Sequence, residues 1–174
     1  MPVRREGSED GPASGPGPHD DVVDALLAAS RALVAIAARS LAGQPTEVTL
    51  PQFRALVVLV SRGPQRVVDI STELGVDPSA GTRLCDRLVR KGLVRRQRSA
   101  SDRRVVRVTL TPPGRALVAE VTERRREELS RIVEAMPGSW PPGVASALHA
   151  FAEATGELPE EQWWMGWQVA GPGE

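Results

Sequence analysis

The side chains that could bind an anion are concentrated between Arg83 and Arg107. This segment holds ten basic residues and two acidic ones, Asp86 and Asp102, which gives a net charge of +8 within 25 residues. The whole chain of 174 residues has a formal net charge of zero. The basic residues are Arg83, Arg87, Arg90, Lys91, Arg95, Arg96, Arg98, Arg103, Arg104 and Arg107. A neutral chain with its positive charge in one segment predicts a surface that binds a polyanion.

A solvated charged face is the other interpretation of a basic run. Here the basic residues alternate with apolar ones at spacings typical of a helix and two strands, and the regions on either side are neutral or acidic. Residues 1–47 carry a net charge of −3 and residues 120–174 a net charge of −6. We therefore favour a folded binding surface, and a helix next to a β-hairpin suits duplex DNA.

The residues needed for catalysis or for metal binding are scarce. The chain has one cysteine, Cys85, and two histidines, His19 and His149, which are far apart in the sequence. No nucleophile–base pair, metal cluster or phosphate-binding glycine loop is evident, so we expect no enzymatic activity, no metal and no cofactor. Cys85 is expected to fill space in the core as a small apolar residue. A cysteine that senses oxidants is the alternative.

The ends of the chain suggest a cytoplasmic protein without membrane contact. The N-terminus lacks the apolar stretch of a signal peptide, and no segment has the roughly 18 apolar residues of a membrane span. Gly, Pro, Ser and acidic residues dominate residues 1–19, which predicts a disordered tail.

The elements that would position the basic segment can be read from apolar periodicity and from capping residues. Thr49 and Gln52 form a potential capping box for a helix that stops at Gly63. Asp77 followed by Pro78 is a second helix start, and Gly75 suits the left-handed position that ends the preceding helix. The expected elements are helices over 20–41, 50–62, 67–74 and 78–91, strands over 93–98 and 104–110, and helices over 112–136 and 144–158. Two short helices joined by a tight turn and followed by a hairpin make a winged helix-turn-helix.

The terminal helices are expected to form a dimer. The first is apolar on several faces, and the last repeats apolar residues in heptad-like steps from Val144 to Leu158. The helix from Pro112 has a highly charged middle, in which three pairs stand at i, i+4 spacing: Glu120–Arg124, Arg124–Glu128 and Glu127–Arg131. Its apolar stripe is expected to be Leu117, Val121, Leu129, Ile132 and Met136. A second copy of the chain is the simplest cover for such helices.

A cluster of tryptophans near the C-terminus has two interpretations. Trp163, Trp164 and Trp167 lie in a chain with only two phenylalanines and no tyrosine. They either pack back on apolar helix surface, or line a pocket for a small effector. The sequence does not decide between the two.

The fold class is therefore mainly α (α+β), a winged helix-turn-helix with N- and C-terminal dimerisation helices. We expect a disordered tail over residues 1–19, a dimerisation helix over 20–47, the DNA-binding domain over 48–111, dimerisation helices over 112–158 and a Trp-rich tail over 159–174.

Three segments of this chain resemble the MarR family of bacterial transcription regulators. They are LPQFRALVVL in the second helix, VVDISTELGVDPSAGTRLCDRLVRKGLVRR in the helix-turn-helix, and SDRRVVRVTLTPPGR in the wing. The last is the most specific, because it combines Asp-x-Arg at the tip of the wing with Leu-Thr-x-x-Gly at the end of the second strand. The resemblance covers about residues 20–158.

The resemblance implies a homodimer that binds a pseudo-palindromic operator in double-stranded DNA, usually as a repressor. It also implies release of the DNA by a small, often aromatic or phenolic, ligand. The helix over 78–91 would enter the major groove with Ser79, Thr82, Arg83 and Arg87. Asp102 would orient Arg104 toward the minor groove. From their charge we expect Arg95, Arg96, Arg98, Arg103 and Arg107 to meet phosphates. A winged helix that binds proteins and no DNA is the main alternative.

Overall fold

A computed structural model gives the fold of the chain and describes residues 17–98, 104–138, 140–160 and 163. The chain divides into two compact units, residues 1–35 and 36–174. The division falls inside the first helix, Pro18–Leu41. The expected disordered tail lies mostly outside the described residues, but its last two residues, Pro18 and His19, already belong to the first helix.

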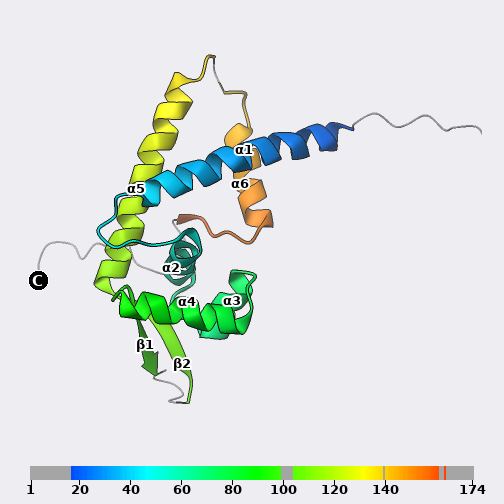
Figure 1. The fold of residues 1–174 in the computed structure, drawn as a ribbon. Coiled ribbons are helices and arrows are strands. Elements are labelled where there is room, and N and C mark those ends of the chain that lie inside the picture. Colours follow the sequence, from blue (N-terminus) through cyan, green and yellow to red (C-terminus); the bar gives the residue numbers. More distant parts are fainter. Residues whose placement is uncertain (1–16, 99–103, 139, 161–162, 164–174) are drawn as a thin grey trace, which may run out of the picture. The chain divides into compact units, whose positions relative to one another are not determined.

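Six helices and two strands are present in the described part of the chain (Figure 1). Their bounds are α1 Pro18–Leu41, α2 Leu50–Arg62, α3 Val67–Glu73, α4 Pro78–Arg90, β1 Val94–Arg98, β2 Val106–Leu110, α5 Pro112–Ala135 and α6 Val144–Ala154. The expected winged helix-turn-helix is confirmed: α3 and α4 are joined by a tight turn, and the hairpin β1–β2 follows.

The start of α2 is set by the predicted capping box. The Gln52 N–H donates to Thr49 Oγ1 at 3.4 Å, and the Thr49 N–H donates to Gln52 Oε1 at 3.3 Å. This exchange satisfies two backbone N–H donors at the helix end that would otherwise be unpaired. The helix then buries Phe53, Leu56 and Leu59 in the core.

The packing of α3 against α4 depends on a glycine. A Cβ atom added at Gly81 would lie 1.9 Å from Ser71 Oγ and 3.0 Å from Ser71 Cβ. Ser71 is buried and donates its hydroxyl to the Val67 carbonyl at 2.8 Å. Gly75 has φ of +62°, as predicted for the residue that ends α3. Asp77 stands at the N-cap position of α4 as predicted, but its side chain makes no capping hydrogen bond there.

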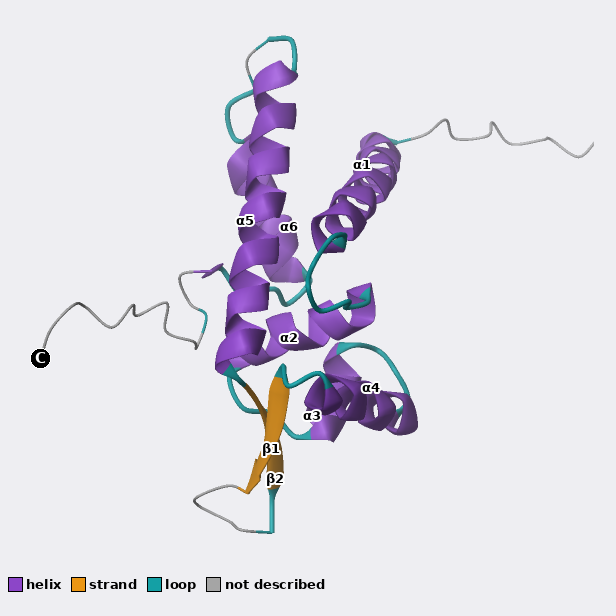
Figure 2. Cartoon of the chain, turned by 60° about the vertical axis from the view of Figure 1, so that its left-hand side comes forward, coloured by secondary structure: helices purple, strands orange, loops and turns teal. Residues whose placement is uncertain are grey.

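The wing is a two-stranded antiparallel sheet (Figure 2). Val94 pairs with Leu110 and Arg98 with Val106, so the register runs through Arg96 opposite Val108. A third segment extends the sheet, because Gln65 and Val108 exchange backbone hydrogen bonds of 3.1 and 2.7 Å. Val94, Val108 and Leu110 are buried, so the base of the wing is held by the core.

The junction between the wing and α5 explains the Leu-Thr-x-x-Gly pattern. Thr111 Oγ1 accepts from the Gly114 N–H at 3.2 Å and donates to the Gly92 carbonyl at 2.6 Å. A Cβ at Gly114 would lie 2.0 Å from the Leu93 carbonyl oxygen, so glycine is needed for this close approach. The first helical turns of α5 then bury Leu117, Val118 and Val121.

The rest of the expected stripe of α5 is not buried in the single chain. Ile132 and Met136 are exposed, and Leu129 is half-buried. Of the three expected ion pairs, Glu120–Arg124 forms at 2.7 Å. The expected Arg124–Glu128 pair is wrong, because Glu128 instead binds Arg39 at the end of α1 at 2.5 Å. Arg131 donates to the Glu127 backbone carbonyl instead of pairing with its carboxylate.

Both terminal helices carry apolar side chains that the single chain leaves exposed. In α6 no residue is buried, and Leu148 and Phe151 are about half exposed. In α1 the exposed apolar residues are Val22, Val23, Leu27, Leu33 and Val34. Among the described residues, no helix is long and apolar enough to cross a membrane.

Candidate nucleic-acid interface

The outer face of α4 presents the four residues predicted to read the major groove. Ser79, Thr82, Arg83 and Arg87 are all exposed. They lie opposite the buried residues Gly81, Cys85 and Leu88, which anchor the helix in the core. The Thr82 hydroxyl donates to the Pro78 carbonyl at 2.8 Å, which leaves its oxygen lone pairs and its methyl group for another partner. The two arginines line one shallow depression together with Arg90.

Three of the predicted phosphate-binding residues lie on β1, and an ion pair connects this strand to α4. Arg95, Arg96 and Arg98 are exposed on the wing. Arg96 Nη2 lies 2.7 Å from Asp86 Oδ1. Because Asp86 comes from α4, this contact joins the helix and the wing into one charged surface. It also means that part of the charge of Arg96 is already neutralised.

The other predicted residues are Arg107 on β2 and three residues that precede this strand, which begins at Val106 and not at Arg104 as expected. Arg107 is half-buried and donates from Nη1 to the Pro64 carbonyl at 3.0 Å, so it also supports the start of the turn before α3. Arg104 is exposed at the foot of the tip. Asp102 and Arg103 lie outside the described residues, so the expected orientation of Arg104 by Asp102 stays a prediction.

The single cysteine lies behind this surface. Cys85 is free and fully buried, and burial raises the pKa of its thiol. A higher thiol pKa means less thiolate at neutral pH, and the thiolate is the form that oxidants attack. The geometry supports the interpretation of Cys85 as core filler. No cluster of three or more metal-ligating side chains occurs within the described ranges.

A second feature is a cavity of about 690 Å³ between α2, α5 and the chain that follows α6. Phe53, Val57, Leu129 and Trp163 provide apolar walls, and Arg54, Arg125 and Arg126 provide charge. The guanidinium carbon of Arg125 lies 5.5 Å from the centre of the Phe53 ring. Its Nε is buried and has no hydrogen-bond partner among the described residues. Burial lowers the pKa of this guanidinium, because the charged form is deprived of water.

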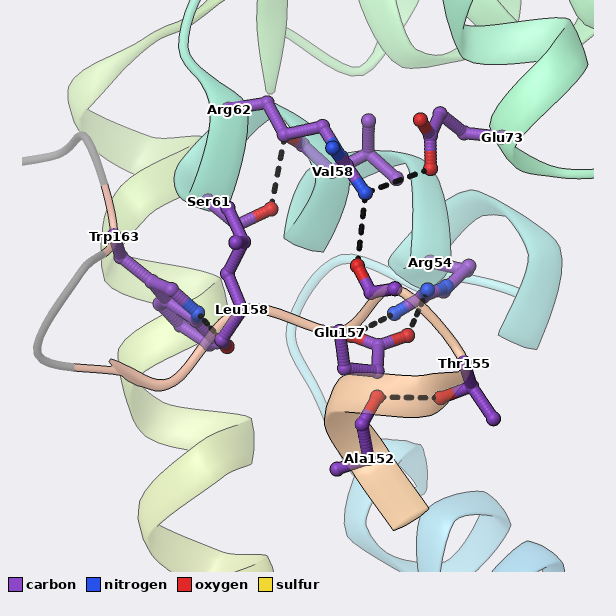
Figure 3. Close-up of polar contacts among 11 residues, drawn as sticks. Arg54, Val58, Ser61, Arg62, Glu73, Ala152, Thr155, Glu157, Leu158 and Trp163 are labelled. Carbon is purple, nitrogen blue, oxygen red and sulfur yellow. Dashed lines mark hydrogen bonds and ion pairs between the residues drawn. The ribbon is translucent and has the colours of Figure 1, made fainter. Parts of the chain in front are cut away.

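The chain after α6 lines one side of this cavity. Figure 3 shows its contacts with Arg54 and Arg62 of α2. We name residues 156–160 and 163 the tail strap. Glu157 accepts two hydrogen bonds from Arg54, one of them 3.0 Å long, and Glu160 binds Arg126 at 2.9 Å. The Trp163 indole N–H donates to the Leu158 carbonyl at 3.0 Å, and its ring packs against the core. Trp163 thus both packs back and lines the pocket, whereas Trp164 and Trp167 lie outside the described residues.

Sequence reasoning missed both the cavity and the tail strap. Arg125 sits in the highly charged middle of α5, and neither its charge nor its spacing marks it as half-buried. The partners Arg54 and Glu157 are 103 residues apart, so no periodic pattern relates them. The aromatic composition of the tail was the one usable signal, and it pointed to a pocket only as one of two possibilities.

A sequence model of the MarR family matches residues 48–106. The chain is 31% identical to the Bacillus subtilis HTH-type transcriptional regulator YfiV over 108 residues, which cover 62% of this chain and 68% of YfiV. Several other curated regulators are matched over 60% or less of their own length. The residues matched by the family model, 48–106, include α2, the helix-turn-helix and β1, and they end at the first residue of β2.

Solved structures extend the similarity to most of the chain. The crystal structure of RV1404 from Mycobacterium tuberculosis is 46% identical, with a TM-score of 0.75, and the match covers 83% of this chain and 99% of that one. The structure of Bordetella bronchiseptica BpsR is 25% identical, with a TM-score of 0.59, and covers 84% of this chain and all of that one. The DNA binding of BpsR is regulated by 6-hydroxynicotinic acid.

Proposed function

Because the chain belongs to the MarR family of transcriptional regulators, we propose that it binds double-stranded DNA as a homodimer and represses transcription from a pseudo-palindromic operator. A small aromatic or phenolic ligand would release the DNA. The observation that carries the proposal is the concentration of exposed arginines on one surface, formed by α4 and β1.

The shape and charge of this surface support binding to a duplex. A helix with exposed Ser79, Thr82, Arg83 and Arg87 has both hydroxyl and guanidinium donors, which recognise base edges in the major groove. The adjacent strand has three exposed arginines that suit phosphates. A winged helix used only for protein contacts would not need this charge, so the rival function is less well supported.

The homodimer is supported by the exposed apolar residues of the terminal helices. A soluble domain rarely leaves side chains such as Leu148 and Phe151 on α6 and Val133 on α5 uncovered. Two identical chains related by a two-fold axis would present two α4 helices, which matches an operator with two half-sites about one helical turn apart.

The cavity supports a role for a ligand. Its aromatic wall suits a planar ring, and the half-buried Arg125 suits an anionic substituent on that ring. BpsR, whose DNA binding is regulated by 6-hydroxynicotinic acid, is similar over most of the chain. We therefore propose an aromatic acid as the class of effector. A cysteine-based sensor is less well supported, because Cys85 is fully buried.

The test is a titration of the purified protein with labelled duplex DNA taken from the region beside its own gene. Affinity should fall steeply with salt, because several phosphates displace counterions on binding. The Arg104→Ala variant should bind roughly 1–3 kcal/mol more weakly at fixed salt, since it loses a groove or phosphate contact.

Arg131→Ala is the matched control, since Arg131 is an exposed arginine of α5 outside the basic segment. It should leave the affinity within experimental error. Equal affinities for wild type and Arg104→Ala would refute the role of the wing residue, and a lack of any salt dependence would refute binding to DNA.

A further inference from the structure

The tail strap occupies one side of the cavity with its own carboxylates. We propose that its carboxylates are internal competitors for the arginines of the cavity, and that an anionic aromatic ligand must displace them to pair with these arginines. The inference concerns the regulation of the ligand site and rests on the role proposed for the cavity above. It assigns a function to the segment after α6, which neither the basic surface nor the dimer accounts for.

The first step in the argument is the charge balance of the cavity. Three arginines line it, and the strap neutralises two of them: Glu157 pairs with Arg54 and Glu160 with Arg126. A two-point contact between a guanidinium and a carboxylate is the geometry in which such pairs are strongest. An incoming carboxylate therefore finds two of its three potential partners already occupied by the chain itself.

The second step concerns the third arginine. Arg125 Nε is buried and has no hydrogen-bond partner in the part of the chain that the structure describes, and the guanidinium lies over the Phe53 ring. A buried unpaired donor carries an energetic cost that a ligand could remove. A carboxylate on an aromatic ring would pair with Arg125, and it would be repelled by Glu157 and Glu160 as long as the strap remained in place.

The third step connects the strap to the helix-turn-helix. Arg62, at the end of α2, donates from Nη2 to the Gly156 carbonyl at 2.9 Å, and the same nitrogen lies 3.1 Å from Glu73 Oε2 in α3 (Figure 3). Moving the strap would remove one of the two acceptors of this guanidinium. A change at the cavity would thus reach α3, against which α4 packs through Gly81.

The test uses benzoate as the probe and calorimetry of the full-length protein as the measurement. Glu157→Gln keeps the size of the side chain and removes its charge. It therefore weakens the contact of the tail strap with Arg54 and also removes the repulsion between Glu157 and the carboxylate of benzoate. We expect benzoate to bind this variant roughly 1.5- to fivefold more tightly than wild type, which is the range for loss of a partly exposed ion pair.

Glu153→Gln is the matched control. Glu153 lies one turn earlier on α6, is exposed, and makes no ion pair within the described part of the chain, so its replacement removes the same charge without loosening the strap. Its benzoate affinity should equal that of wild type. Equal tightening in both variants would mean a general charge effect and would overturn the proposal.

Hydrogen exchange provides a second readout. The backbone N–H of Glu157 donates to the Ala152 carbonyl, and the backbone N–H of Trp163 donates to the Glu160 carbonyl, both at 3.1 Å. Saturating benzoate should speed exchange of these two amides in wild type. Slower exchange, together with weaker binding by Glu157→Gln, would show that the strap closes over the ligand as a lid, and the proposal would fail.

The outcomes separate this proposal from the proposed function. A protein that binds operator DNA but no benzoate in any variant would overturn the strap proposal and leave DNA binding intact. If the protein binds no DNA, but Glu157→Gln binds benzoate more tightly than wild type, the strap proposal is supported and the proposed DNA-binding function is refuted.

Discussion

The winged helix-turn-helix buries its apolar side chains, whereas the helices outside it leave many of theirs exposed. In residues 48–121 the core is closed within one chain, and Leu56, Ile70, Leu88 and Val121 are fully buried. In α6 not one residue is buried. The first region thus has a closed core within one chain, while the second leaves its apolar surface exposed in the single chain. In the proposed function, binding DNA and forming the dimer would therefore be separate tasks of separate parts of the sequence.

The largest effect is expected in the packed region. Leu56→Ala leaves a cavity where the side chain is 0% exposed, so the free energy of unfolding should fall by about 2–5 kcal/mol. Urea unfolding at a fixed protein concentration measures this. Val68→Ala, on the exposed side of α3, is the control and should change the value by about 0.5 kcal/mol or less. A loss below about 1 kcal/mol for Leu56→Ala would contradict the closed core.

A smaller effect, of a different kind, is expected from α6. Leu148 is 52% exposed in the single chain, and its truncation should cost about 1 kcal/mol for each copy at a dimer interface. Leu148→Ala should therefore raise the dimer dissociation constant roughly thirtyfold, which sedimentation equilibrium can measure. Ser146→Ala, on the same helix, should not change it. If Leu148→Ala leaves the dissociation constant unchanged, α6 is not part of the interface.

The smallest effect concerns the thiol at the back of α4. Burial raises the pKa of Cys85, so native protein at pH 7 should react with iodoacetamide roughly tenfold or more slowly than protein unfolded in urea. The stability contributed by a neutral thiol is fully present below the pKa of the unfolded thiol, and it is lost as the pH rises through the raised pKa of the folded state. Equal reactivity of native and unfolded protein would favour the alternative, in which Cys85 senses oxidants.

The contrast between the two regions also explains which parts of the fold could be predicted from the sequence. Helices and strands of residues 48–121 follow local rules: Thr49 and Gln52 cap α2, and Gly75 ends α3. Their apolar residues repeat with the period of the element, because one face is buried inside the same chain. The basic residues of α4 and β1 could therefore be assigned to the surface before the structure was known.

The cavity and the tail strap could not be predicted in this way. They depend on contacts between distant residues such as Arg54 and Glu157, whose side chains meet only after α6 has turned back toward α2. The half-buried position of Arg125 has the same origin. Likewise, the partners expected for Glu128 were the neighbours along α5, whereas the observed partner is Arg39, 89 residues away. Long-range packing decides which of several plausible ion pairs forms.

The junction at Thr111 has a mechanical consequence. It joins β2 directly to α5, with its hydroxyl held by Gly92 and with Gly114 pressed against Leu93, so no flexible linker separates the wing from the long helix. At 1.5 Å per residue, the 24 residues of α5 form a lever about 36 Å long. If α5 tilts by about 10° about one end, its other end moves by about 6 Å. A tilt of α5 would therefore rotate the wing with it, because the two are joined without a linker.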